Sequence, residues 1–214
     1  MIKGINFQPW ISENYEKGTS KYGRLLLLGE SHYYEEDNEE EEKDDVVESE
    51  QQIEILDSQN NFTSAVVQDF LDKKHNIPFF RNLGLLFNSN DKYEIWSEIA
   101  FANGIQVALN SSTAQPTSEE IDTIKSAFWL LLDNLKPDKI LVCSKRMWNY
   151  WLPEDKLRAE HLLNISENNK HSNIWQYKIN DKNCLAMGIN HPSKYFSYEN
   201  WRPIVINFLT NKYI

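Results

Sequence analysis

The amino-acid sequence alternates short apolar runs with longer stretches in which apolar positions recur every three or four residues. Short apolar runs that end in turn residues are typical of strands buried on both faces of a parallel sheet. We therefore expect buried strands within residues 24–29, 99–103, 138–144 and 184–188. Residues 174–179 alternate apolar and polar side chains, which indicates a strand near a sheet edge.

The periodic stretches predict helices. Apolar residues share one helix face over residues 62–74 and again over residues 78–88. Thr117 and Glu120 have the spacing of a capping box, and Pro137 marks the end of the helix that they begin.

The remaining stretches have weaker patterns. We expect a helix after the strand at 138–144 and a terminal helix over residues 201–210, with Pro203 in its first turn. Residues 1–23 predict an irregular lead-in whose aromatic side chains pack on the core. Residues 153–173 are polar and predict a surface helix and loop.

Strands that alternate with helices predict a parallel sheet covered on both faces. The expected fold class is α/β, a three-layer α/β/α arrangement around a central, mostly parallel sheet of about four strands. A chain of 214 residues suits one domain, 1–214, and the sequence shows no internal repeat and no interdomain linker.

The composition is that of a soluble globular protein, with 41% hydrophobic and 25% charged residues. No apolar run has the length of a membrane span, and the first residues lack the apolar segment of a secretory signal. Cys143 and Cys184 lie in apolar runs and predict buried, reduced thiols. Since no metal-ligand spacing is present either, we expect a cytoplasmic protein with no membrane partner, metal or cofactor.

The net charge of −10 comes from one segment. Residues 35–50 hold eleven of the 32 acidic and one of the 22 basic residues, so the remainder has 21 of each. The simplest interpretation is an acidic, mobile, solvated insertion. A mimic of phosphate charge, a lid or a partner-binding tail are the alternatives.

Polar side chains stand at the ends of three predicted strands. Glu30 follows the first strand, Asn103 ends the second and His191 follows the last. Because ligands of open α/β sheets bind beyond the carboxyl ends of the strands, we expect these side chains to lie close together. A carboxamide can pair with the donor–acceptor edge of a base, an imidazole can donate to a developing oxyanion, and a carboxylate can orient water or stabilise positive charge.

These strand-end motifs resemble those of the uracil-DNA glycosylase superfamily. There, one strand ends in a motif that starts with Gly (Gly-Gln-Asp-Pro-Tyr-His or Gly-Glu-Ala-Pro-Gly), a later strand ends in Asn, and a motif that starts with His-Pro-Ser closes the site. Here Gly29-Glu30-Ser31-His32-Tyr33-Tyr34 takes the first place and Asn103 the second, while His191-Pro192-Ser193 is identical over three residues. The resemblance extends over residues 20–210.

The resemblance implies base flipping, in which a base extruded from DNA is read in a pocket. It implies that Asn103 reads the uracil edge, that His191 stabilises negative charge on uracil O2 and that Glu30 stabilises water or a cation. The catalytic candidates are Glu30, Ser31 and His191. The substrate-binding candidates are Gly29, His32, Tyr33, Tyr34, Phe79, Phe80, Asn103, Pro192 and Ser193, among which Tyr33, Tyr34, Phe79 and Phe80 are alternatives for the stacking aromatic.

Departures from the superfamily pattern bear on catalysis. Ser31 stands where the best-known branch has a water-activating Asp, and His32 replaces the motif's Pro. Glu30 matches the Glu of the second branch, but the cysteines for that branch's iron–sulfur cluster are absent.

Three functions therefore stay open. The first is a monomeric, uracil-DNA-glycosylase-like hydrolase that recognises or excises a base in damaged or single-stranded DNA. The second is a non-catalytic module of the same fold that binds a nucleobase or nucleic acid. The third is a hydrolase of free nucleosides or of another small molecule.

Overall fold

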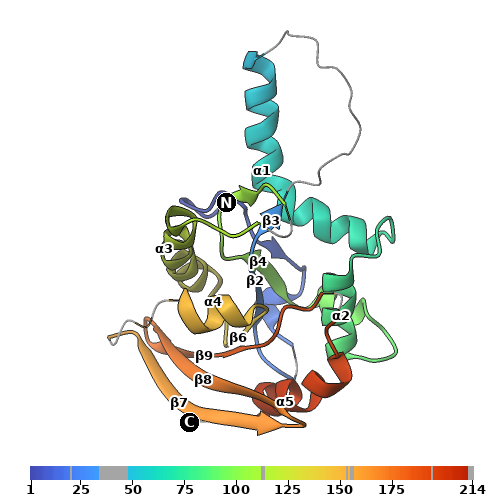
Figure 1. The fold of residues 1–214 in the computed structure, drawn as a ribbon, viewed down its shortest axis with the longest axis vertical. Helices are drawn as coiled ribbons and strands as arrows, with labels where there is room; N and C mark the ends of the chain where they lie inside the picture. Colours follow the sequence, from blue (N-terminus) through green and yellow to red (C-terminus); the bar gives the residue numbers. More distant parts are fainter. Residues whose placement is uncertain are drawn as a thin grey trace.

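A computed structural model describes residues 1–19, 21–33, 48–111, 114–152, 154, 157–193 and 195–211, with the backbone alone for 48–59. Its centre is a seven-stranded sheet in the order β1-β4-β2-β6-β9-β8-β7 (Figure 1). A separate two-stranded sheet pairs β3 with β5. The strands of the large sheet are β1 (Trp10–Ile11), β2 (Leu25–Gly29), β4 (Ala100–Asn103), β6 (Lys139–Val142), β7 (Ala159–Glu167), β8 (Lys170–Ile179) and β9 (Lys182–Gly188), and those of the small sheet are β3 (His32–Tyr33) and β5 (Ala108–Leu109).

The α/β class is confirmed, but the expected sheet of about four mostly parallel strands is wrong. The four central strands β4, β2, β6 and β9 are parallel and match the four apolar runs. Three further strands, β1, β8 and β7, add antiparallel pairs at both edges and make the sheet mixed.

The predicted surface helix and loop at 153–173 is also wrong, because β7 lies there. An edge strand is polar where its faces meet water, so the sequence of β7 has no apolar run to reveal it. The turn to β8 is Asn168–Asn169, and both residues have positive φ (48° and 59°). A two-residue loop with positive φ at both positions is the preferred connection of a β-hairpin.

Each face of the sheet is covered by helices. Leu25 and Leu27 of β2 pack in the core beneath α1 (Glu48–Leu71), α2 (Pro78–Phe87) and α5 (Tyr198–Thr210). Leu26 and Leu28 point the other way, into the core beneath α3 (Ser118–Leu135) and α4 (Lys145–Tyr150). Because successive side chains of a strand alternate between the faces, a run of four leucines fills both cores. Figure 1 shows α3 and α4 on one side of the sheet and α2 and α5 on the other.

The helix ends follow local chemistry. The capping box of α3 is confirmed, since Glu120 N donates to Thr117 Oγ1 (3.3 Å) and Thr117 N donates to Glu120 Oε2 (2.6 Å). Helix α1 starts at Glu48, well before the predicted position 62. Helix α5 starts earlier than predicted too, because Ser197 caps it, so Pro203 lies in its second turn and not in its first.

The N-terminal segment packs its aromatic side chains as expected. Phe7, Tyr15 and Tyr22 are buried, and the segment contributes β1 at the sheet edge and a 3₁₀ helix, η1 (Tyr15–Lys17). A second 3₁₀ helix, η2 (Glu94–Ser97), precedes β4.

Two predicted features fall on residues that the structure does not describe. Tyr34 and positions 35–47 of the acidic insertion lie outside the described residues. Among the residues that the structure does describe, no helix is long and apolar enough to cross a bilayer. No group of three or more His, Cys, Asp or Glu side chains among them is arranged to hold a metal ion.

Candidate functional site

The carboxyl ends of β2 and β4 lie side by side. Gly29 is paired with Asn103 in the parallel register. Beyond the strands, Gly104 N donates to the Gly29 carbonyl (3.0 Å) and Ile105 N donates to the Glu30 carbonyl (2.9 Å). The two polar strand ends therefore form one backbone unit.

A pocket of about 460 Å³ lies between these strand ends and helices α1 and α2. We call it the strand-end pocket. It brings together eight predicted site residues: Glu30, Ser31, His32, Tyr33, Phe79, Phe80, Asn103 and His191. Gly29, Pro192 and Ser193 are not among its lining residues. Phe62, Val66, Asp69, His75, Ile77 and Phe101 complete the lining.

Asn103 offers an unused carboxamide to this pocket. The residue is 3% exposed, and its side chain makes no hydrogen bond with any residue that the structure describes. Its Oδ1 lies against the Cα atom of Gly29, where an added Cβ would stand only 2.2 Å away. Gly29 therefore supports the site from behind the pocket, because a side chain at this position would displace the Asn103 carboxamide.

His191 stands exposed at the pocket mouth, on a fixed turn. Its ring centroid lies 5.0 Å from that of Phe79, with the planes tilted by 48°. The buried Asn82 of α2 donates from Nδ2 to the carbonyl oxygens of Pro192 (3.1 Å) and Ser193 (3.0 Å). Sequence reasoning missed Asn82, which holds the His-Pro-Ser turn against α2.

The surroundings of His191 shift its pKa toward favouring the neutral imidazole. Partial burial of the ring lowers its pKa below the ordinary value, the charge of Glu30 opposes this shift, and the charge of Arg146 adds to it. A neutral imidazole has one N–H donor and one acceptor nitrogen.

Glu30 is engaged with a partner that sequence reasoning also missed. Arg146 Nε donates to both carboxylate oxygens (3.0 and 2.9 Å), and its Nη2 donates to Oε1 as well. The Ser144 hydroxyl donates to Oε2. Both residues follow β6, so the strand-end rule that selected Glu30, Asn103 and His191, applied to this strand as well, would have found them.

His32 is a packed wall of the pocket. Its ring meets Phe7 and Phe62 edge-on, at centroid distances of 4.9 and 4.7 Å, and its Nε2 lies 2.9 Å from Thr63 Oγ1. Burial lowers its pKa to about 4, so the imidazole is neutral at neutral pH.

The aromatic candidates differ in their availability. Phe80 is buried and packs edge-on against Trp96 (5.2 Å) and Phe101 (5.3 Å), so it backs the pocket. Phe79 is half-buried and faces His191. Tyr33 is 45% exposed at the rim.

Each described carboxylate that lines the strand-end pocket has a basic partner. Glu30 is paired with Arg146, and Asp69 lies 2.8 Å from Lys74 Nζ. With both charges compensated, the lining suits a neutral, flat molecule that needs a donor and an acceptor.

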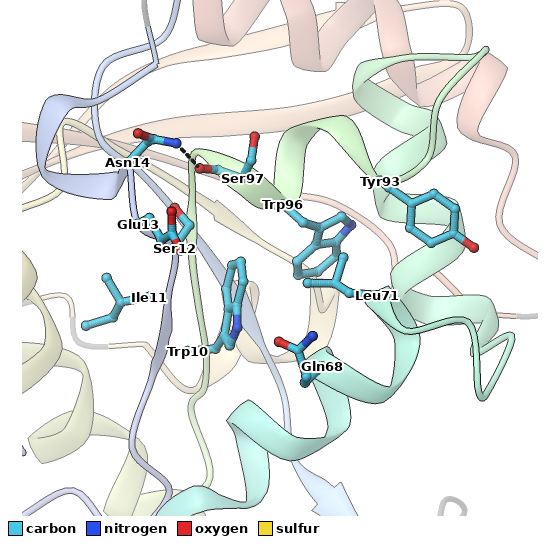
Figure 2. Close-up of a pocket in the computed structure, with 10 residues that line it drawn as sticks. All are labelled: Trp10, Ile11, Ser12, Glu13, Asn14, Gln68, Leu71, Tyr93, Trp96 and Ser97. Carbon is cyan, nitrogen blue, oxygen red and sulfur yellow. Dashed lines mark hydrogen bonds between the residues drawn. The ribbon is translucent and has the colours of Figure 1, made fainter.

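A second pocket, of about 420 Å³, lies at the β1 edge (Figure 2). Trp10 of β1, Gln68 and Leu71 of α1 and Trp96 of η2 are among its walls. It contains none of the predicted site residues. Through Trp96 it shares the aromatic layer that backs the strand-end pocket.

Comparison of the chain with models of known protein families and with curated proteins finds no match. The interpretation of the site therefore depends on its geometry and chemistry.

Proposed function

We propose that the strand-end pocket receives a nucleobase displaced from DNA and that the chain recognises or excises this base by hydrolysis of its N-glycosidic bond. The observation that carries the proposal is the Asn103 carboxamide, buried in a pocket of about 460 Å³ without a hydrogen-bond partner among the described residues. A carboxamide carries both a hydrogen-bond donor and an acceptor, so Asn103 can pair with a ligand that enters this pocket.

Uracil has the matching edge. The carboxamide oxygen of Asn103 can accept from the N3–H group, and its NH₂ group can donate to O4. The half-buried Phe79 lines the same pocket, and stacking on aromatic side chains is a usual way to hold an extruded base.

His191 is suited to stabilise the leaving base. As the glycosidic bond breaks, negative charge develops on the uracil ring, and a neutral imidazole can donate its N–H to O2. Desolvation lowers the pKa of His191, which favours a neutral hydrogen-bond donor over a cation. Glu30, fixed by Arg146, contributes negative charge beside the sugar cation that forms.

Uracil-containing single- and double-stranded oligonucleotides test the proposal. Purified protein should generate abasic product, and Asn103→Ala and His191→Ala should each reduce the rate at least about tenfold. Asn134→Ala, on exposed α3 surface, and His161→Ala, an exposed imidazole 5.8 Å from Trp175, are matched controls. No abasic product from uracil, hypoxanthine or xanthine substrates would exclude the excision activity.

A second function, binding without hydrolysis, is favoured by the state of Glu30. Both of its carboxylate oxygens accept hydrogen bonds from Arg146, and Ser144 also donates to Oε2, so its ability to activate a water is reduced. Ser31 supplies no carboxylate base in its place. Retention of an intact uracil oligonucleotide, lost in Asn103→Ala, would distinguish this function from excision.

A further inference from the structure

We infer that Arg146, Trp151 and Tyr150 form a second subsite beside the strand-end pocket, which binds a phosphate and the base of the neighbouring nucleotide. We call these three residues the α4 ledge. The inference rests on the proposed function for the occupant of the pocket. It specifies the substrate class as a single strand of nucleic acid, in place of a free base or nucleoside.

The guanidinium group of Arg146 is held in one orientation but retains free donors. A guanidinium carries five N–H groups. Nε and Nη2 donate to Glu30, and Nη1 donates to Gln115 Oε1 (2.6 Å). Two N–H groups are left over, and the side chain is 37% exposed. A fixed pair of donors on an exposed guanidinium suits the oxygens of a phosphate.

Two aromatic side chains follow Arg146 along the chain. Tyr150 comes four residues later in α4, a spacing that puts it on the same side of the helix, and Trp151 comes directly after it. The Arg146 guanidinium carbon lies 5.0 Å from the centre of the Trp151 ring, which is half-buried on the α3 side of the sheet. Tyr150 is 79% exposed and has no ring contact within the described part of the chain. Stacking of bases on such rings, beside a group that binds the backbone, is how single-stranded nucleic acid is held without sequence preference.

The ledge adjoins the strand-end pocket directly. Glu30 lines the pocket and is bound to Arg146, so one carboxylate touches both subsites. The charges of Glu30 and Arg146 both act on His191 at the pocket mouth. A strand whose base enters the pocket therefore passes its next phosphate over Arg146.

The charge balance predicts a weak dependence on salt. Glu30 neutralises Arg146, so the phosphate is held by short hydrogen bonds and not by long-range attraction. A phosphate neutralised by one free cationic side chain on a single strand gives a slope of about −0.7 in log K against log salt concentration, so the slope here should be no steeper than that.

Two binding measurements test the inference. Fluorescence anisotropy gives the affinity for a labelled single-stranded decamer with one central 2′-fluoro-2′-deoxyuridine, and calorimetry gives the affinity for free 2′-deoxyuridine. Trp151→Ala, Tyr150→Ser and Arg146→Lys should each weaken decamer binding about tenfold. Trp151→Ala and Tyr150→Ser, which change no residue of the strand-end pocket, should leave the affinity for the nucleoside unchanged.

Arg158 provides a matched control. It also stacks on a tryptophan, with its guanidinium carbon 3.8 Å from the centre of the Trp129 ring, and it also pairs with a carboxylate, Asp133 (2.9 Å). Gln115, a partner of Arg146, lies just before the start of α3, whereas Asp133 lies near the end of that helix, roughly 20 Å away along its axis. The pair of Arg158 and Asp133 is therefore separate from the α4 ledge. Arg158→Lys should change neither affinity.

The outcomes separate the two proposals. Ledge variants that bind the decamer as tightly as the wild type, or a wild type that does not bind it, overturn the inference even if the nucleoside binds in the pocket. Binding of the decamer that depends on the ledge, without any binding of the nucleoside, supports the ledge and contradicts the proposed function of the pocket. Tyr150→Ser changes an exposed side chain only, so it gives a result even if Trp151→Ala fails to fold.

Discussion

Burial of His32 makes the folded state sensitive to acid. The pKa of His32 is about 4 in the folded protein, against an ordinary value of 6.5, because the ring is desolvated between Phe7 and Phe62. Between these two pH values the unfolded chain binds a proton that the folded chain does not. Stability is therefore lost as pH falls from about 6.5 to about 4, and this loss does not grow further below pH 4. A pKa difference of about 2.5, at 1.36 kcal/mol for each unit, corresponds to about 3 kcal/mol.

Urea unfolding of the wild type and of His32→Gln, at pH 7.5 and pH 4.5, measures this term. Glutamine does not titrate, so the fall in unfolding free energy between the two pH values should be smaller in the variant, by roughly 2–3 kcal/mol. The exposed His75, also at the strand-end pocket, provides the control, and His75→Gln should follow the wild type. An equal pH dependence in His32→Gln and the wild type would refute the assignment of His32 as a neutral, packed wall of the pocket.

Three further predictions follow from single contacts. Gly29→Ala should abolish nucleoside binding in calorimetry, because the added Cβ would lie 2.2 Å from Asn103 Oδ1, and unchanged binding would show that Asn103 is not the reading group. Asn82→Ala should lower the unfolding free energy, measured in urea, by about 1–3 kcal/mol, since two carbonyl oxygens of the His-Pro-Ser turn lose their donor. The control, Asn90→Ala at an exposed position, should have no effect. Equal stability of Asn82→Ala and the wild type would contradict the role of Asn82 in holding the turn. Burial raises the pKa of both cysteine thiols, so Cys143 and Cys184 should react with a thiol reagent only after unfolding, and rapid labelling of the native protein would contradict their burial.

The central strands could be predicted because they are buried on both faces. Their apolar runs carry the signal by themselves, and the four leucines of β2 are fully buried. The polar β7 could not be found in this way, since an edge strand obtains its stability from a neighbour and not from its own pattern. Its clearest local signal was the Asn168–Asn169 turn.

The candidate site shows the same division. Glu30, Asn103 and His191 were selected because each stands at the end of a predicted strand. They line one pocket, although they lie far apart in the sequence. The same criterion was not applied to β6, so Ser144 and Arg146, which follow that strand, were left out. That Glu30 pairs with Arg146 in particular could not be read from the sequence, because the contact spans 116 positions. His32 was selected as a polar residue after a strand, yet its surroundings are aromatic and supplied by remote segments.

A crystal structure with a single-stranded oligonucleotide that carries 2′-fluoro-2′-deoxyuridine is the most direct test of the account. The 2′-fluorine disfavours the sugar cation, so the glycosidic bond should persist in the crystal. The account predicts that the uracil ring lies in the strand-end pocket, with its N3–O4 edge hydrogen-bonded to the Asn103 carboxamide and one face against Phe79. A uracil bound outside this pocket, with Asn103 making no contact to it, would contradict the account.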